Sequence, residues 1–243
     1  MWDKEKAEKY DAWYDTPAGA FALGREVRLV EHMTSGWPRR GQRLLEIGCG
    51  TGVFLQVLHR AGFDVTGLDK SPAMLDLART RLGNLADFHL GDAEHLPFDD
   101  KEFDFSVMLT VLEFCRDPGL AVTEAARVSR KGFLIGFLNK WSLYHLSVLA
   151  FPGAYGGAMR QAHWFSPWDL GRLIHDTLGS KPYKVSSVLP GPRITWRYRT
   201  PWRQLNYPIL PLPIGGYCAL RVNLLKEPVR TPLHAWTTKP EAS

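Results

Sequence analysis

A glycine-rich loop preceded by an acidic residue is the strongest chemical signal in the sequence. Gly48, Gly50 and Gly52 stand at alternate positions, and Glu46 comes just before them. Glycine lets the backbone turn tightly and approach a ligand without a Cβ atom in the way. A helix that begins after such a loop points its free N–H groups at whatever lies there. The glycines alone fit a tight turn without a ligand equally well.

Two further acidic residues suit a nucleotide-like ligand. Asp69 comes 21 residues after Gly48, where a carboxylate can accept hydrogen bonds from both hydroxyls of a ribose. Asp92 follows another apolar run, and its carboxylate can accept from the exocyclic amine of adenine. Each residue also has a structural explanation, as a helix cap at Asp69 and a turn residue at Asp92. Three such features at successive strand ends favour a bound ligand.

Alternating strands and helices must position these residues. Short apolar runs predict buried strands, and apolar residues at helical spacing between caps predict helices. Parallel strands need crossovers of helix length, so the alternation predicts a doubly wound parallel sheet. The predicted core strands are 43–48, 64–69, 86–91, 103–109 and 132–138, with helices at 51–61, 71–82 and 118–130.

The flanking regions add helices and two late strands. Helices are expected at 3–15 and 20–34, with Pro17 and Gly19 breaking the chain between them. Ser166 and Pro167 are typical of the start of another helix, over 166–174. Late strands are expected at 183–189 and 217–225, on either side of a proline- and arginine-rich insertion at 190–216.

Four segments of the core together resemble the class I S-adenosylmethionine-dependent methyltransferases, above all the small-molecule group that includes the ubiquinone and menaquinone biosynthesis enzymes. The segments are EIGCGTG, LDKSPAMLDLAR, GDAEHLPFDDKEFDFSVMLTVLEF and EAARVSRKGFLIG, within residues 43–138. The resemblance implies an α/β, Rossmann-like sheet of seven strands, mostly parallel with an antiparallel last strand and helices on both faces. It also implies S-adenosyl-L-methionine as methyl donor, S-adenosyl-L-homocysteine as product and a small-molecule acceptor methylated by in-line displacement.

The resemblance implies a cofactor role for each matching position. Glu46 would orient the loop and the methionine amino end, while Asp69 would hold the ribose hydroxyls. Asp92 and Ala93 would bind the adenine edge, with Lys70 stacked beside the ring. The other residues that would line the cofactor are Gly48, Cys49, Gly50, Gly52, Leu109 through its carbonyl oxygen, and Tyr10 or Tyr14 from the aromatic N-terminal segment.

Two rival nucleotide-binding families are disfavoured. A nicotinamide dehydrogenase is disfavoured because its G-x-G-x-x-G fingerprint would need glycine where Val53 stands, and a P-loop because no GK[ST] sequence follows the glycines.

The resemblance also implies that the chain forms one domain. The expected parts are a helical cap at 1–42, a cofactor-binding core at 43–138, a lid and acceptor segment at 139–180, and the last two strands within 181–243.

The acceptor is less clearly indicated than the donor. Thr110 to Glu113 lack the Asp/Asn-Pro-Pro-aromatic motif of enzymes that methylate nucleic-acid amino groups, and Cys49 and Cys115 do not suit carbon-5 cytosine chemistry. Three scattered cysteines also give no metal site. A small organic acceptor is therefore the favoured interpretation, and nucleic acid is disfavoured.

Two residues are candidates for catalysis at the acceptor. Glu113 could act as a base or hold a cationic substrate, but a cap for the helix near Pro118 or a pair with Arg116 is slightly favoured. His163 could accept a proton near neutral pH, although a single histidine more often has a structural role. Aromatic residues that could line an apolar pocket are Tyr155 and Trp164.

The positive charge is concentrated near the end of the sequence. Of the net charge of +5, residues 181–243 contribute ten Lys and Arg against only Glu227 and Glu241. Arginines and aromatics interleave over 193–203, a pattern that suits phosphates with stacked bases, or an anionic membrane surface. A solvated, irregular insertion with arginine stems over apolar surface is favoured. An acceptor pocket or oligomer contact comes second, and an RNA methyltransferase third. A non-catalytic cofactor-binding protein is a further alternative.

The sequence favours a cytoplasmic protein, as a monomer or homodimer. Its three cysteines form no disulfide framework, which favours a reducing compartment. The first residues are charged and aromatic, unlike a signal peptide, and no apolar run reaches the ~18 residues of a membrane span.

Overall fold

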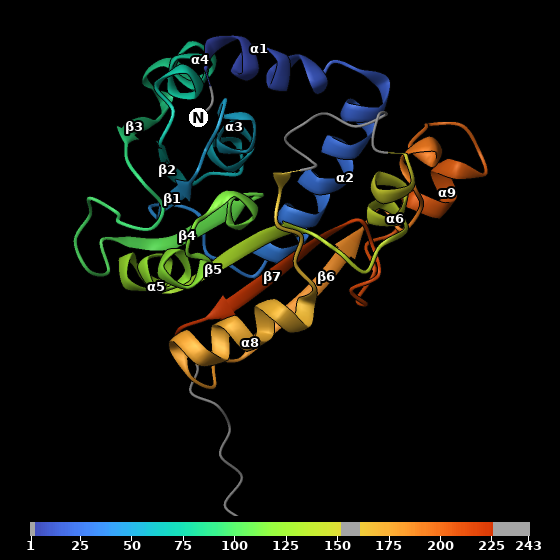
Figure 1. Cartoon of the computed structure of the whole chain (residues 1–243). Helices are drawn as coiled ribbons and strands as arrows, with labels where there is room; N and C mark the ends of the chain where they lie inside the picture. Colours follow the sequence, from blue (N-terminus) through green and yellow to red (C-terminus); the bar gives the residue numbers. More distant parts are fainter. Residues whose placement is uncertain (1–2, 152–160, 226–243) are drawn as a thin grey trace, which may run out of the picture.

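A seven-stranded sheet forms the centre of the computed structural model, which describes residues 3–151 and 161–225 (Figure 1). The strands are β1 Arg43–Ile47, β2 Asp64–Asp69, β3 Asp87–Leu90, β4 Phe103–Leu109, β5 Ser129–Leu138, β6 Tyr183–Val188 and β7 Tyr217–Asn223. Their order is β3-β2-β1-β4-β5-β7-β6, and only β7 runs antiparallel to its neighbours. The predicted sheet is confirmed, including its antiparallel last strand.

Helices cover both faces of this sheet. Side chains alternate along each strand, so Leu44 enters the apolar cluster beneath α2 and α3, while Leu45 enters the cluster beneath α5 and α8. Figure 1 shows these two pairs of helices on opposite sides of the strands. The α-helices are α1 Lys4–Trp13, α2 Pro17–Thr34, α3 Val53–Arg60, α4 Pro72–Leu82, α5 Pro118–Val128, α6 Leu143–Ala150, α8 Pro167–Leu178 and α9 Trp202–Asn206.

The second helix begins earlier than expected. Pro17 and Gly19 do not separate two helices but form the first turn of α2, because Thr16 caps it by accepting a hydrogen bond from the Gly19 N–H at 3.1 Å. A Cβ atom on Gly19 would lie 2.0 Å from the Trp13 carbonyl oxygen. Glycine at this position therefore allows α2 to begin directly against the end of α1.

The insertion between β6 and β7 is solvated over residues 197–205, as expected, but is less irregular than expected because it holds two short helical elements. Asn206 is fully buried in it, and its Nδ2 donates to the Thr195 carbonyl oxygen at 3.2 Å and to the Trp202 carbonyl oxygen at 3.1 Å. The Oδ1 atom of Asn206 accepts from the Gly191 N–H at 3.0 Å, and Trp196 is 3% exposed. These contacts fold α9 and the 3-10 turn Arg193–Thr195 into one unit.

Residues 3–151 and 161–225 include no helix with the length and apolarity needed to cross a bilayer.

Candidate functional site

The glycine loop after β1 has a left-handed backbone conformation at three positions. Gly48, Gly50 and Gly52 have φ angles of 70°, 52° and 78°, which residues with a Cβ atom rarely adopt. A Cβ atom would lie 2.6 Å from Val111 at Gly48 and 2.9 Å from Leu82 at Gly52. At Gly50 it would meet nothing within 4 Å. The loop is therefore packed on two sides and open at Gly50.

Asp69, at the end of β2, fixes the loop. Its Oδ2 accepts from the Gly50 N–H at 2.9 Å and its Oδ1 from the Ser71 N–H at 2.8 Å, while Ser71 itself caps α4. Asp69 is 8% exposed, and burial raises its pKa despite these hydrogen bonds. Each carboxylate oxygen retains a second lone pair that could accept from a ligand.

Glu46 brings a second carboxyl group beneath the loop. The residue is 2% exposed, and its Oε2 is buried without a hydrogen-bond partner among the described residues. Burial, followed by repulsion from Asp69, raises its pKa well above the usual value. An unpaired buried polar atom costs free energy. We therefore expect Glu46 Oε2 to accept a hydrogen bond from a bound ligand.

Hydrogen bonds hold the N-terminal helix against the loop, and they come from residues that the sequence did not single out. We call the contacts among Asp11, Thr51 and Arg81 the latch. Thr51 donates its hydroxyl to Asp11 Oδ1 at 2.6 Å, and Arg81 Nη2 lies 2.8 and 3.0 Å from the two Asp11 oxygens. The other terminal nitrogen of Arg81 donates to the Thr51 carbonyl oxygen. Figure 1 shows α1 beside α4, the helix that carries Arg81. No local pattern connects residue 11 with residue 81, so only the fold reveals this latch.

Tyr10 lies in α1 and Tyr14 directly follows it, and both side chains are half-buried. Their hydroxyl oxygens are 2.7 Å apart. Burial raises the pKa of Tyr10 to about 12, and the charges of Glu46 and Asp69 add to this rise. The structure thus brings Tyr10 near the two predicted carboxylates.

Glu113 is buried after β4 and does not have the role that was favoured for it. Its Oε1 accepts from the Leu138 N–H at 2.7 Å, and its Oε2 is buried without a partner among the described residues. The expectation of a helix cap or an Arg116 pair is wrong. Asp117 caps α5, and the Arg116 N–H donates to Glu94 at 2.6 Å. Burial raises the pKa of Glu113 to about 7.

Two further residues, the buried Tyr217 and the half-buried Glu26, interact electrostatically with each other and were not predicted. Tyr217, on β7, is 1% exposed, and a Cβ atom on Gly136 of β5 would lie 2.1 Å from its hydroxyl oxygen. Burial raises the pKa of Tyr217, and the charges of Glu26 on α2 and Glu113 add to it. Burial also raises the pKa of Glu26 to about 7. Sequence spacing could not connect these residues because they come from three separate elements.

The backbone turns sharply where β4 ends. Leu109 is 7% exposed, and the next residue, Thr110, has a φ of 57°, a strained value for a residue with a branched side chain. The Thr110 N–H donates to the Gly136 carbonyl oxygen at 2.8 Å, which holds this conformation. Strained backbone of this kind often marks a functional site.

Other predicted residues lie at the edge of the site. His163 has an exposed side chain that contacts Phe165, and its backbone N–H donates to the Glu113 carbonyl oxygen at 2.9 Å. Trp164 is 9% exposed and packs against Tyr144 and His145. Tyr155 lies outside the described residues.

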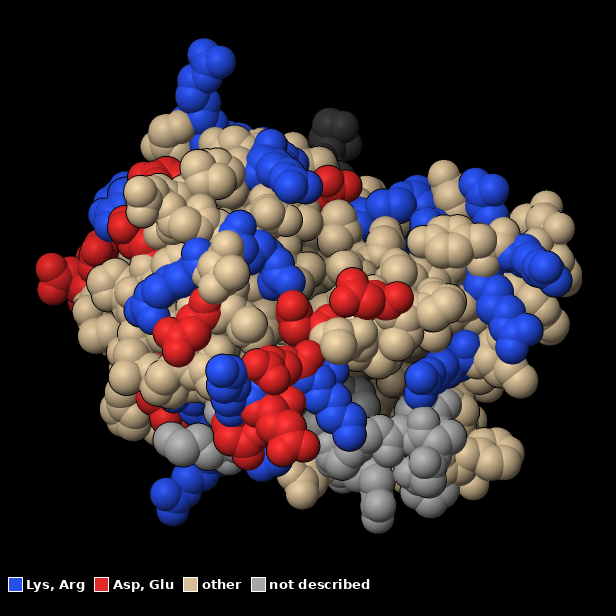
Figure 2. Space-filling view, turned by 90° about the horizontal axis from the view of Figure 1, so that it is seen from above, with Lys and Arg blue, Asp and Glu red and all other residues tan. Residues whose placement is uncertain are grey.

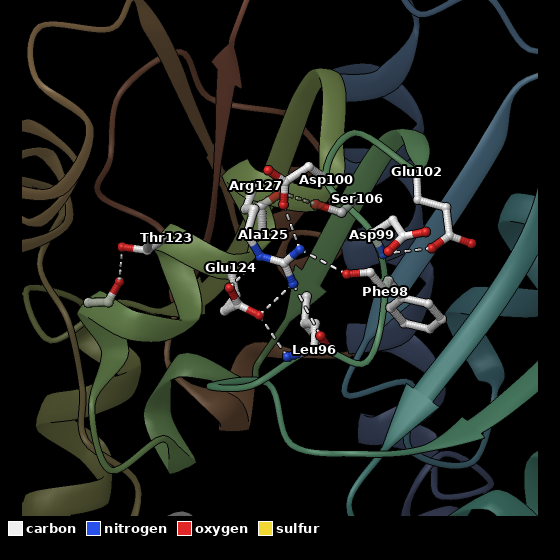
Figure 3. Close-up of polar contacts among 11 residues, drawn as sticks. Leu96, Phe98, Asp99, Asp100, Glu102, Ser106, Thr123, Glu124, Ala125 and Arg127 are labelled. Carbon is white, nitrogen blue, oxygen red and sulfur yellow. Dashed lines mark hydrogen bonds and ion pairs between the residues drawn. The ribbon is translucent and has the colours of Figure 1, made fainter.

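The segment after β3 places the residues expected near adenine. Asp92 is exposed and accepts from the Glu94 N–H at 3.1 Å, Ala93 is 9% exposed, and Lys70 is exposed. Arg127 fixes the chain that follows, by donating to the Phe98 carbonyl oxygen at 2.8 Å (Figure 3). Figure 3 also shows its ion pairs with Glu124 and Asp100, at 2.6 and 2.9 Å.

Comparison with known proteins matches the part of the chain that carries the glycine loop, Glu46 and Asp69. Residues 45–136 match the model of a methyltransferase domain family. A malonyl-[acyl-carrier protein] O-methyltransferase of Serratia marcescens is 40% identical over 133 residues, which are 54% of this chain and 48% of that protein. The chain spans about half the length of several curated relatives that it matches.

Solved structures share the fold over most of the chain. An S-adenosylmethionine-dependent methyltransferase from Thermotoga maritima superposes with a TM-score of 0.71 at 24% identity, covering 90% of this chain and 96% of that one. Magnesium protoporphyrin IX methyltransferase from Synechocystis, with bound S-adenosylhomocysteine, gives 0.63 at 16% identity over 89% and 94%. Residues 45–136 thus match a methyltransferase domain, and the chain shares the fold of solved S-adenosylmethionine-dependent methyltransferases.

Proposed function

We propose that the protein transfers a methyl group from S-adenosylmethionine to a small-molecule acceptor. The observation that carries the proposal is the pairing of an open loop at Gly50 with the unpartnered Oε2 atom of buried Glu46. A bound ligand with a donor group at this position would satisfy the carboxylate. The methionine amino group of the cofactor is such a donor.

The surrounding residues fit the rest of the cofactor. Asp69 would accept from ribose hydroxyls with its remaining lone pairs, and Asp92, Ala93 and Lys70 would face the adenine end. The methionine end would lie against Gly48, Cys49, Gly50 and Gly52, with the Leu109 carbonyl oxygen and the Tyr10–Tyr14 pair beside it. When bound, S-adenosylmethionine supplies a methyl group on a positively charged sulfur, which a nucleophile can displace.

The acceptor would meet two other carboxyl groups, those of the buried Glu113 and the half-buried Glu26. Glu113 and Glu26 both have a pKa of about 7 and both act electrostatically on Tyr217. A carboxyl group with such a pKa can accept a proton near neutral pH. We therefore assign Glu113 Oε2 to take the proton that leaves a hydroxyl or amine acceptor as the new bond forms. His163 is a weaker candidate because its side chain is exposed and faces Phe165.

The relatives do not define the acceptor. Glu26 and Tyr217 both lie outside residues 45–136, which match the domain model. A match of 54% of this chain to an enzyme of malonyl-acyl carrier protein therefore supports donor use more than acceptor choice. An RNA methyltransferase is not favoured by these comparisons.

We also propose that the described residues act as one domain in the cytoplasm, as a monomer or homodimer. Strands β6 and β7 complete the same sheet as the cofactor loop, which supports a single unit. The three cysteines are free, which suits a reducing compartment.

Calorimetric titration with S-adenosylhomocysteine tests the proposed cofactor site. Wild-type protein should bind, and Asp69→Ala should weaken binding by about 10-fold or more, because it removes charge-assisted hydrogen bonds worth roughly 1.5–3 kcal/mol each. Asp76→Ala, at an exposed site on α4, is the matched control and should bind as wild type does. A folded wild-type protein that fails to bind would refute the proposal.

A further inference from the structure

We propose that Arg25, Arg28 and Arg203 form a binding site for the phosphate group of a ligand, separate from the cofactor loop. We call these three residues the arginine site. Arg25 and Arg28 lie on α2, and Arg203 lies on α9. Neither the domain match at 45–136 nor the proposed methyl transfer involves them.

The three guanidinium groups converge on a single aromatic ring. Their central carbons lie 5.0 Å (Arg25), 4.2 Å (Arg28) and 5.7 Å (Arg203) from the centroid of the Tyr207 ring. Arg28 also donates to the Tyr207 carbonyl oxygen at 3.1 Å. Tyr207 therefore positions three positive charges within a small volume.

These charges lack anionic partners in the described part of the chain. Arg25 is 9% exposed, and its Nε and Nη1 atoms are buried with no hydrogen-bond partner among the described residues. The ion pairs formed among residues 3–151 and 161–225 include none of the three arginines. Burial and then repulsion by Arg28 lower the pKa of Arg25. Arg25 is buried, Arg28 is half-buried and Arg203 is exposed, so the buried charge of Arg25 costs free energy that an anion joining the cluster would offset.

The surface beside the arginine site is hollowed. A cavity of ≈ 480 Å³ is lined by Thr200, Arg203, Gln204, Tyr207 and Pro208. Of the three arginines, Arg203 lines this hollow itself, and the Thr200 hydroxyl and the Gln204 amide beside it are neutral donors. Figure 2 shows Lys and Arg without visible Asp or Glu over the side of the molecule that carries α9. The hollow thus has room for a phosphate-bearing ligand and a positive rim to attract it.

Phosphate suits this arrangement better than a single carboxylate. The planar guanidinium group presents parallel N–H donors that match two oxygens of one phosphate, and several such groups can share its oxygens. The phosphate could belong to a soluble molecule or to a lipid headgroup, and both carry the chemistry that the arginine site recognises.

Binding of phenyl phosphate, measured by calorimetry against phenol at matched ionic strength, tests the arginine site. Wild type should bind phenyl phosphate and not phenol. Arg203→Gln and Arg28→Gln should each weaken binding by about 10-fold, the loss of one charge-assisted bond worth about 1.4 kcal/mol. Arg60→Gln, on exposed α3 surface, is the matched control and should not change it. Equal losses in Arg60→Gln and Arg203→Gln would overturn the proposal, because they would indicate only diffuse charge.

Arg25→Met separates a binding role from a structural one. The change keeps an apolar stem and removes a buried charge, so the protein should unfold at the same or a higher temperature while phenyl phosphate binding is lost. A lower unfolding temperature with unchanged binding would contradict the proposal. Co-sedimentation with phosphatidylglycerol vesicles, compared with phosphatidylcholine, then distinguishes the sources. If wild-type protein sediments with the phosphatidylglycerol vesicles and Arg203→Gln does not, the phosphate belongs to a lipid. If the protein binds phenyl phosphate but does not sediment with the vesicles, the phosphate belongs to a soluble molecule.

Discussion

Glu113 is the buried residue to which we assign the proton transfer from the acceptor. Its unpartnered Oε2 atom and its pKa of about 7 follow from one cause, the removal of the carboxyl group from water. The sequence placed Glu113 after β4 but could not show this, because the expected cap at Pro118 was equally consistent with the local pattern. Asp69 and Glu46 were predictable from spacing, whereas Glu26 and Tyr217 meet Glu113 only through tertiary packing.

The stability of the protein should depend on pH through Glu113. A carboxyl group whose folded-state pKa is raised destabilises the fold progressively as pH rises from its unfolded value to its folded value. For Glu113 this window runs from 4.5 to about 7, and the shift corresponds to roughly 3 kcal/mol at 1.36 kcal/mol per unit. Glu113→Gln should therefore gain stability relative to wild type across this window and not below it. Urea unfolding at several pH values measures the difference, and a difference independent of pH would contradict the environment described for Glu113.

At the scale of elements, the core strands and most helices follow from sequence because each burial pattern is local. The bounds of β2 and β4 agree with the expected bounds to the residue. Helix α4 agrees with expectation from Pro72 to Leu82. Helix α6 was not predicted, because Leu143–Ala150 is apolar on its buried and exposed sides alike and shows no amphipathic period. The predicted start of α2 was wrong because a proline and a glycine can begin a helix as well as break one.

The glycine loop should respond differently at its open and packed positions. Gly50→Ala puts a methyl group into open space, so it should cost only about 1 kcal/mol of backbone strain while obstructing the cofactor. Gly52→Ala has the same strain and also meets Leu82, so its free energy of unfolding should fall further. Thermal unfolding and S-adenosylhomocysteine titration of both variants test this. A Gly50→Ala variant with wild-type affinity would show that the cofactor does not lie against this position.

The latch of α1 onto the loop should control how firmly the N-terminal helix is held. Arg81→Gln removes the contacts to Asp11 and to the Thr51 carbonyl oxygen, so amide hydrogens of residues 4–13 should exchange faster. Arg79→Gln, on the same helix, removes only an exposed pair with Asp76 and is the matched control. Hydrogen exchange read by mass spectrometry distinguishes the two variants, and equal protection in both would mean that other contacts hold α1.

At the scale of the whole molecule, the proposed cofactor site and the arginine site are built from different elements. Glu46 and Asp69 of the proposed cofactor site lie at the ends of β1 and β2, and the arginine site lies where α2 meets the insertion before β7. The sequence predicted that the excess positive charge lies near its end. It could not predict that Arg203 joins Arg25 and Arg28, because these residues are far apart in the chain and meet only when α9 packs near α2.

Methyl transfer itself is the most direct test of the account. Wild-type protein, incubated with methyl-labelled S-adenosylmethionine and a fractionated small-molecule extract, should yield a labelled product whose mass exceeds that of its acceptor by one methyl group in place of a hydrogen. Asp69→Ala should abolish the product by weakening cofactor binding, and Glu113→Gln should reduce product formation while leaving S-adenosylhomocysteine affinity unchanged. Cofactor binding with no labelled product in any fraction would contradict the proposed methyltransferase activity and favour a non-catalytic cofactor-binding protein.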